Sequence, residues 1–245
     1  MCKDCQCDKY ISETMPADEV SRDVEKEEKI KLERDILHEN NHAATDNRAY
    51  FRRHHIFSIN MVSSPGSGKT AILEETLKRL KNIYPLSVIE GDLQTDNDAR
   101  RIKATGVDCL QINTHNGCHL DAFMISKAIV KLHVPKNSLL FIENVGNLVC
   151  PALFDLGEQL RVVVMSVTEG DDKPLKYPYM FEKADVCIIN KTDLLPYLPS
   201  RIETIKENLL SINPNITVFE MSASTGTGVK RWCEFLLNLV MPVVV

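Results

Sequence analysis

Residues 63–70 of this chain read SSPGSGKT. This stretch follows the β-branched run FSINMVS and opens the helical pattern KTAILEETLKRL, so it lies where a strand turns into a helix. Small residues in such a turn let backbone N–H groups surround a phosphate at the positive end of the helix dipole. The sequence therefore predicts a P-loop, in which Lys69 reaches the β- and γ-phosphates and the Thr70 hydroxyl binds Mg²⁺. The residues expected to contact the nucleotide are Ser64, Pro65, Gly66, Ser67, Gly68, Lys69, Thr70 and Ala71, with Ser63 where the general motif has its first glycine.

From residue 56 onward, short apolar runs alternate with helical patterns. Helices are expected through about Asn82 and about Lys131, and from about Ser200 and about Val229. The expected strands are FSINMVS, LSVIEGD, DCLQINT, SLLFIENV, QLRVVVMSV, DVCIINK and ITVFEMSA. This alternation predicts an α/β fold of the P-loop NTPase type, a mostly parallel sheet flanked by helices on both faces. In such sheets, ligands bind at the carboxyl ends of the strands.

The composition excludes several classes of protein. A net charge of −5, with no basic run longer than Arg52–Arg53, argues against a nucleic-acid partner. No stretch approaches the roughly 18 apolar residues needed to cross a membrane. Charged residues interrupt the N-terminus, so we expect no secretory signal and a cytoplasmic protein. Its cysteines should then be reduced, and serve as metal ligands, catalysts or core residues.

Guanine specificity is predicted by the stretch IINKTD at residues 188–193. The carboxylate of Asp193 can accept hydrogen bonds from N1–H and the 2-amino group of guanine, which adenine does not offer. Asn190 would hold the loop, and the stem of Lys191 would lie on the ring. Ser222 and Ala223, after a later strand, are placed to contact the base from the other side. The expected nucleotide is therefore GTP.

Hydrolysis of GTP needs acidic groups near Mg²⁺ and the attacking water. Asp92 and Glu143 follow two of the predicted strands, and together with Lys69 and Thr70 they are the expected catalytic residues. Asp92 is also a candidate Mg²⁺ ligand, although a helix N-cap would explain it too. For Asp96 and Asp98, solvated loop charges are the preferred interpretation.

A second chemistry is indicated by GCHLDA and NLVCPA, which bring Cys118, His119 and Cys150 to the same edge of the predicted sheet. Cys118 and His119 are expected at the start of a helix, where a thiolate is favoured. Thiolate and imidazole ligands suit Ni²⁺ or Zn²⁺ better than Mg²⁺. A buried cysteine and a helix-capping histidine are the alternative. The other internal cysteines, Cys109, Cys187 and Cys233, fit apolar patterns and are expected in the core.

The N-terminal segment MCKDCQC offers three more thiols, Cys2, Cys5 and Cys7. Beside a GTPase with its own Cys/His cluster, it is interpreted as a tethered metal site, since three thiolates and one further donor suit four-coordinate Ni²⁺. We therefore expect a cysteine metal-binding motif at residues 1–10, a charged linker and helical arm at 11–50, and the P-loop GTPase domain at 51–245.

Taken together, the motifs resemble those of one family. MCxxCxC, NRAYF, SSPGSGKT, GDLQTDNDA, GCHLDA, ENVGNLVCPA, TEGDDKPLKYP and NKTDLLPY run from the N-terminus to the GTPase motifs as in the HypB family of hydrogenase maturation GTPases. Members of the family share the serine at the start of the P-loop. The motif CxxCGC of the family has Gln6 in place of its glycine here, which restricts the backbone at that position.

The resemblance implies a slow GTPase of the dimerising P-loop class that delivers nickel to, or promotes its insertion into, [NiFe]-hydrogenase. It implies a metal site of Cys118, His119 and Cys150 at a nucleotide-dependent homodimer interface, with Leu194 and Leu198 in dimerisation. GTP or GDP, Mg²⁺, and Ni²⁺ or Zn²⁺ are the implied ligands. The nickel accessory protein HypA and the hydrogenase large subunit are the implied partners. The scattered histidines argue against nickel storage.

Three alternatives remain open. An accessory GTPase for another nickel enzyme, of the urease type, is disfavoured because Cys150–Pro151 is followed by Ala152 where that relative has histidine. A regulatory GTP-binding module would use the cysteines structurally. A small-molecule kinase would make the NKTD motif fortuitous.

Overall fold

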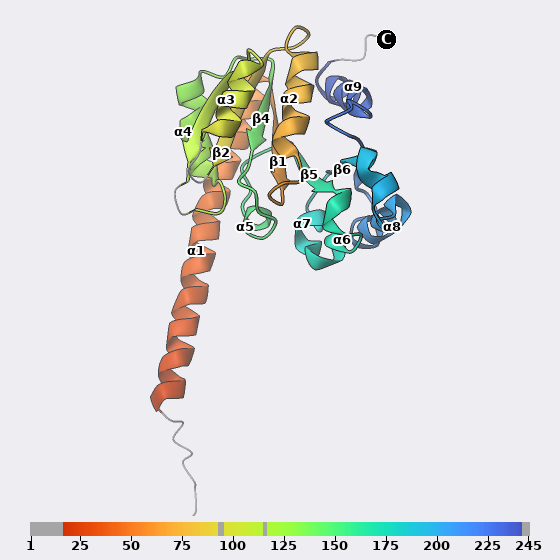
Figure 1. Cartoon of the computed structure of the whole chain (residues 1–245). Helices are drawn as coiled ribbons and strands as arrows, with labels where there is room; N and C mark the ends of the chain where they lie inside the picture. The colour runs from red at the N-terminus through yellow and green to blue at the C-terminus, as the bar shows by residue number, and fades with distance from the viewer. Residues whose placement is uncertain (1–16, 93–95, 115–116, 242–245) are drawn as a thin grey trace, which may run out of the picture. The chain divides into compact units, whose positions relative to one another are not determined.

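The computed structural model describes residues 17–92, 96–114 and 117–241, with the backbone alone at residues 17–30 and 33 (Figure 1). The chain divides into two compact units, Met1–His38 and Glu39–Val245. In the first unit, the described part is helical and belongs to α1 (Ala17–His54). The predicted N-terminal metal ligands Cys2, Cys5 and Cys7 lie outside the described residues.

The second unit is built on a seven-stranded sheet in the order β3-β2-β4-β1-β5-β6-β7. All of its strand pairs are parallel, which confirms the predicted α/β fold. The strands are β1 (Ile56–Ser63), β2 (Leu86–Asp92), β3 (Asp108–Asn113), β4 (Ser138–Glu143), β5 (Leu160–Ser166), β6 (Val186–Asn190) and β7 (Thr217–Glu220). Since β1, β4 and β5 are almost wholly buried, their near-continuous apolar sequences are those of strands covered on both faces.

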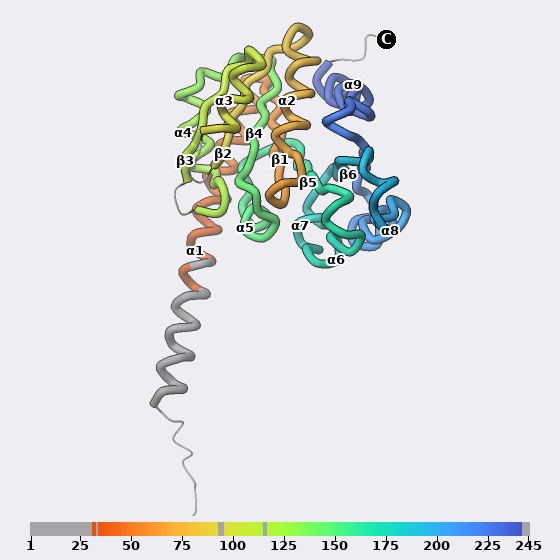
Figure 2. The backbone as a smooth tube through the Cα atoms, viewed as in Figure 1, coloured from red at the N-terminus to blue at the C-terminus, as the bar shows by residue number. Residues whose placement is uncertain are grey.

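Helices cover both faces of the sheet (Figure 2). One face packs against α2 (Lys69–Leu80), α3 (Asn97–Ala104) and α9 (Val229–Val240), with Trp232 fully buried. The other face packs against α4 (Ala122–Leu132), α7 (Pro178–Glu182), α8 (Ile202–Ile212) and the C-terminal end of α1. Short helical turns complete the fold: α5 (Cys150–Leu153), α6 (Lys173–Lys176), η1 (Val167–Glu169) and η2 (Thr192–Tyr197). As predicted, Cys109, Cys187 and Cys233 are buried in the core.

The parallel arrangement fixes where a site can form. The P-loop follows β1, Asp92 ends β2, and Asn144 and Lys191 follow β4 and β6, so all of them lie at the same edge of the sheet. Within the part of the chain that the structure describes, no helix combines the length and the apolar character that a bilayer crossing requires.

Candidate nucleotide and metal site

The P-loop turns from β1 into α2 through two residues with left-handed backbone. Gly66 has φ +78° and Gly68 has φ +93°, which side-chain-bearing residues rarely adopt. A Cβ atom at Gly68 would also collide with the amide of Asn190. Glycine at this position therefore brings the phosphate loop directly against the NKTD segment.

A cavity of about 430 Å³ opens above this loop. Residues 63–71 line one side, and Glu90, Gly91, Asp92, Asp98, Arg101, Val145 and Gly146 line the rest. The ends of β1, β2 and β4 thus contribute to one cavity. Its shape and its P-loop floor suit the phosphates of a nucleotide.

Glu143, the last residue of β4, joins two P-loop side chains. Its Oε1 accepts hydrogen bonds from Lys69 Nζ at 2.9 Å and Thr70 Oγ1 at 2.6 Å, and the residue is fully buried. Its Oε2 is buried with no hydrogen-bond partner among the described residues. A hydroxyl and an unpartnered carboxylate oxygen side by side are hard oxygen donors, so this corner fits Mg²⁺.

Asp92, the other expected acid, lies at the end of β2 and lines the same cavity. Asp98 also lines the cavity and pairs with Arg101, with 3.1 Å between Oδ1 and Nη1. Asp96 instead forms an exposed ion pair with Arg100. The structure therefore brings Asp92 and Asp98 to the cavity, and the side chain of Asp96 is held on the surface of α3.

Glu90 is a cavity residue that the sequence analysis missed. It is 2% exposed, and its Oε2 has no hydrogen-bond partner in the described part of the chain. Burial, and then the neighbouring charge of Glu143, raise the pKa of Glu90 to about 8. The period of two along a strand puts residue 90 on the same side of the sheet as residue 92, and this signal could have found it.

The guanine-specifying residues are joined to the P-loop. Asn190 Nδ2 donates to the Ser67 carbonyl at 2.9 Å, and Lys191 Nζ donates to the Gly66 carbonyl at 2.7 Å. The backbone N–H of Ala223 donates to Asn190 Oδ1 at 3.1 Å. The structure thus brings the three predicted nucleotide-binding segments together.

Asp193 is exposed at the start of η2, beside the segment that follows β7. A hydrogen bond with Ser222 lowers the pKa of the Asp193 carboxyl below its usual range. The carboxylate form, which accepts hydrogen bonds, is therefore favoured near neutral pH.

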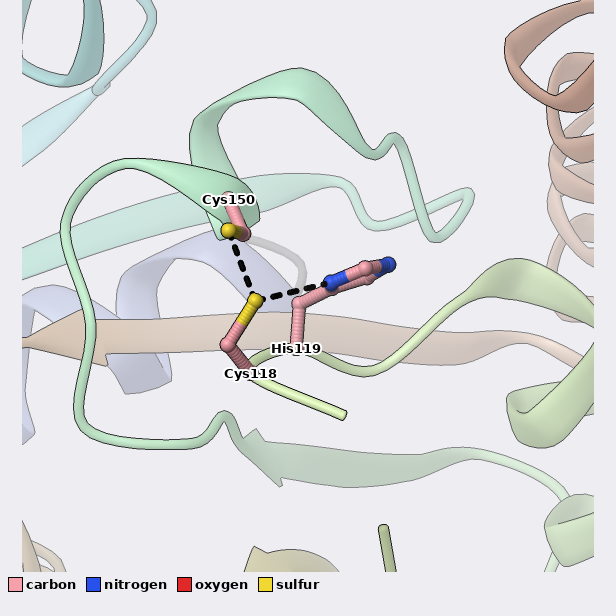
Figure 3. Close-up of side chains that lie close together, drawn as sticks. All are labelled: Cys118, His119 and Cys150. Carbon is pink, nitrogen blue, oxygen red and sulfur yellow. Dashed lines mark hydrogen bonds between the residues drawn. The ribbon is translucent and has the colours of Figure 1, made fainter. Parts of the chain in front are cut away.

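Cys118, His119 and Cys150 form the second cluster (Figure 3). One ligand atom from each lies within 4.8 Å of the other two. The two Sγ atoms are 2.7 Å apart, and Cys118 Sγ is 3.7 Å from His119 Nδ1. Burial lowers the pKa of His119, which favours the neutral imidazole that binds metals. Two thiols and one imidazole at this spacing fit Ni²⁺ or Zn²⁺.

The expectation that Cys118 and His119 begin a helix was wrong. Helix α4 begins at Ala122, because the Asp121 side chain accepts a hydrogen bond from Met124 N and caps the helix there. Cys118 therefore lies in the loop before the helix. The hydrogen bond with Cys150 raises the pKa of Cys118 instead of lowering it. Cys150 is the residue that begins a helical turn, α5.

One loop, residues 144–149, connects the two clusters. Asn144 is fully buried, and its Oδ1 accepts a hydrogen bond from the backbone N–H of Leu120, next to His119, at 3.1 Å. Asn147 Nδ2 donates to the Cys118 carbonyl at 3.3 Å. Gly146 lies so close to Pro65 that an added Cβ would be 3.3 Å from its ring. The loop thus contacts the P-loop and the Cys/His cluster.

Comparison with protein families supports a nucleotide site. Residues 58–220 match the family described as CobW/HypB/UreG, nucleotide-binding domain. The hydrogenase maturation factor HypB of Azotobacter vinelandii is 53% identical over 207 residues, covering 84% of this chain and 68% of the relative. The hydrogenase/urease maturation factor HypB of Helicobacter hepaticus is 41% identical over 211 residues, covering 84% of this chain and 86% of that relative.

A solved structure also resembles this chain in both fold and sequence. The crystal structure of HypB from Helicobacter pylori in complex with nickel matches with a TM-score of 0.77 at 40% identity. The match covers 82% of this chain and 94% of that chain. At this similarity both the fold and the sequence of the nucleotide-binding domain are shared.

Proposed function

Because this chain belongs to the HypB family of hydrogenase maturation factors, we propose that it is a GTP-hydrolysing nickel metallochaperone for [NiFe]-hydrogenase. It has the P-loop NTPase fold and the nucleotide-binding domain of the family. The observation that carries the proposal is the Cys118–His119–Cys150 cluster, joined by one short loop to the P-loop cavity. Two thiols and an imidazole with ligand atoms within 4.8 Å of one another are a donor set suited to Ni²⁺.

In this proposal, Lys69 neutralises charge on the β- and γ-phosphates while Thr70 and Asp92 bind Mg²⁺. When bound, Mg²⁺ would supply positive charge that stabilises the charge developing on the phosphates. Glu143, at 2.9 Å from Lys69 Nζ and 2.6 Å from Thr70 Oγ1, holds both P-loop groups in place. Asn190, Lys191, Asp193, Ser222 and Ala223 select guanine.

Nickel is the proposed cargo of the Cys/His cluster. Two cysteines and a histidine leave a coordination position open, which is what a site that passes on its metal requires. The nickel complex of the Helicobacter pylori relative supports this choice of metal. Zn²⁺ would fit the same donors and is the main competitor.

We propose that GTP hydrolysis changes the affinity for nickel through the loop at residues 144–149. Asn144 follows Glu143 directly and holds Leu120, while Asn147 holds Cys118. A shift of this loop in response to the nucleotide would therefore move the metal ligands. Coupling of this kind requires that nickel affinity differ between the nucleotide states.

A homodimer that depends on the nucleotide is part of the same proposal. Val149 and Leu153 flank Cys150 and are 58% and 47% exposed, an apolar surface that a second copy could cover. Leu194 and Leu198, the dimerisation residues implied by the resemblance, are partly buried against the core. In this proposal they contact the second copy through the part of each side chain that remains exposed.

The remaining assignments extend the proposal to the whole chain. Residues 1–10 would bind a second nickel ion through Cys2, Cys5 and Cys7, residues 11–50 would serve as an arm, and residues 51–245 as the GTPase domain. HypA and the hydrogenase large subunit are the proposed partners. A cytoplasmic location follows from the need to keep the thiols reduced.

The test is the metal content of full-length variants after equilibration with Ni²⁺. Replacing Cys118, His119 and Cys150 together by serine should remove one nickel ion per chain and leave the melting temperature nearly unchanged. The control is Cys109→Ala, a buried cysteine of β3, which should retain that ion. Unchanged nickel content together with a strongly lowered melting temperature would favour the alternative of structural cysteines.

Urease maturation is a second candidate, because the Helicobacter hepaticus relative is named a hydrogenase/urease maturation factor. The two candidates differ in the acceptor of the metal. Expressed in a strain that lacks its own factor, this protein should restore hydrogenase activity. Restoration of urease activity alone would replace the proposed acceptor.

A further inference from the structure

The C-terminal half of α1 is fastened to both segments that carry the Cys/His cluster. Asn47 is 2% exposed, and its Nδ2 donates to the carbonyls of Ala122 at 2.8 Å and Leu156 at 3.0 Å. Ala122 follows the loop of Cys118 and His119, and Leu156 follows the turn of Cys150. One buried amide thus ties together the two parts of the chain that supply the metal ligands.

Asn40 repeats the connection two helical turns earlier. Its Nδ2 donates to the Asp155 carbonyl at 2.8 Å, and its Oδ1 accepts from the backbone N–H of Ala122 at 2.9 Å. Residues seven apart lie on the same face of a helix, so both amides face the same two segments. The repetition indicates that this face of α1 is built to hold them.

An ion pair and a close backbone contact complete the attachment. Arg48 Nη2 donates to both carboxylate oxygens of Asp155, at 2.9 and 2.8 Å. Gly157, with φ +85°, approaches the helix so closely that an added Cβ would lie 2.5 Å from the carbonyl oxygen of Ala44. The segment after Cys150 is therefore seated directly on the backbone of α1.

One ring contact links His119 to the segment that α1 holds. The imidazole of His119 stacks on Phe154, with ring centroids 3.8 Å apart. Phe154 immediately precedes Asp155, which Asn40 and Arg48 hold. The position of the imidazole therefore depends on a segment that α1 fixes.

We propose that Asn40, Asn47 and Arg48 of α1 are positioning residues that set the metal affinity of the Cys118–His119–Cys150 cluster. The proposal rests on the proposed function, since it takes the cluster to bind Ni²⁺. Its physical basis is that the two thiols come from separate segments of the chain, so that a tight site requires their spacing to be fixed before the metal binds. Outer residues that orient ligands change metal affinity by about 10- to 100-fold when they are removed.

The experiment compares Asn47→Ala with Asn213→Ala in full-length protein. Every protein tested, the parent included, carries serine in place of Cys2, Cys5 and Cys7. The measurement then reports only Ni²⁺ binding at the Cys118–His119–Cys150 cluster. Asn213 is a matched control: its Nδ2 donates to the carbonyls of Phe181, Glu182 and Ala184, beside the N-terminal end of β6. Nickel affinity is measured by competition with a chelator, followed by thiolate-to-nickel absorption. Arg48→Lys serves as a milder variant should Asn47→Ala not fold.

We expect Asn47→Ala to weaken Ni²⁺ binding about tenfold and Arg48→Lys to weaken it by less, with GDP affinity unchanged in both. Asn213→Ala should bind Ni²⁺ like the parent. Equal Ni²⁺ affinity in folded Asn47→Ala or Arg48→Lys and the parent would overturn the positioning role while leaving the proposed function standing. A parent that binds no Ni²⁺ at all would overturn the proposed function and this inference together.

Discussion

Glu143 places a fully buried carboxylate at the nucleotide site. It contacts Lys69 and Thr70 through Oε1 while Oε2 faces no protein donor among the described residues. Glu143→Gln keeps the shape and removes the charge. We expect kcat for GTP hydrolysis to fall about 100-fold, the loss typical when one preorganised electrostatic group is removed. Steady-state phosphate release measures it, with Glu75→Gln, on the surface of α2, as the control.

Glu90 gives a prediction for pH. Its pKa is raised from 4.5 to about 8, so between these values the folded protein holds a proton that the unfolded chain has released. The free energy of unfolding of the nucleotide-free protein should then fall as pH rises through this window, by up to about 1.4 kcal/mol per pH unit. The stability associated with the protonated carboxyl of Glu90 is fully present below pH 4.5 and is lost above about pH 8.

Glu90→Gln tests this directly, because glutamine cannot ionise. The melting temperature of the variant minus that of the parent should increase as pH rises from 5 to about 8.5. Circular dichroism follows both unfolding transitions. Melting curves that stay parallel across this range would show that the carboxyl of Glu90 is ionised in the folded protein throughout.

Asp193 tests guanine selection. Asp193→Asn replaces one of two acceptor oxygens by a donor, which opposes the guanine N1–H and 2-amino donors. We expect GTP affinity to fall about 100-fold, as the loss of charge-assisted hydrogen bonds implies, with ATP affinity unaffected. Equilibrium binding of fluorescent nucleotides measures both. Retained preference for GTP would revive the small-molecule kinase hypothesis.

Among the elements, the loop at residues 144–149 is the one proposed to join nucleotide and metal. Asn147→Ala removes the hydrogen bond to the Cys118 carbonyl, 3.3 Å long, without opening the core. We expect the ratio of the Ni²⁺ affinities measured with GDP and with a GTP analogue to move toward one. Ni²⁺ should still bind in both nucleotide states. The exposed Asn215→Ala is the control. An unchanged ratio in Asn147→Ala would assign the coupling elsewhere.

The strands and the P-loop could be predicted because their signals are local. Buried strands such as VVVMS are apolar throughout, and SSPGSGKT carries its own backbone requirements. The start of α4 lies four residues after Cys118 because it depends on a single side-chain cap, the hydrogen bond that Asp121 accepts from Met124 N. Boundaries depend on single side-chain bonds, which periodicity does not show.

The amides that hold the site could not have been predicted. Asn47 sits in a polar helix whose sequence gives no sign of a buried face, and its partners are 75 and 109 residues away. Asn144 likewise binds a backbone N–H that lies 24 residues earlier in the chain. Such contacts exist only once the loops have been brought together by the sheet, so no local pattern encodes them.

At the scale of the molecule, two chemistries share one edge of one sheet. Oxygen donors suited to Mg²⁺ lie at Thr70 and Asp92, and sulfur and nitrogen donors suited to Ni²⁺ lie at Cys118, His119 and Cys150. In the proposed function, this separation by ligand type would direct each ion to its own site. The loop at residues 144–149 contacts both sites and is the proposed route of coupling between them.

A nucleotide-switched metallochaperone is tested by a Ni²⁺ titration of the full-length protein in the presence of GDP and of a non-hydrolysable GTP analogue. We predict that Ni²⁺ affinity at the Cys118–His119–Cys150 cluster differs at least fivefold between the two, and that Ni²⁺ changes the relative affinity for the two nucleotides by the same factor. Equal Ni²⁺ affinity in both nucleotide states, with the cluster intact and occupied, would contradict a nucleotide-switched metallochaperone.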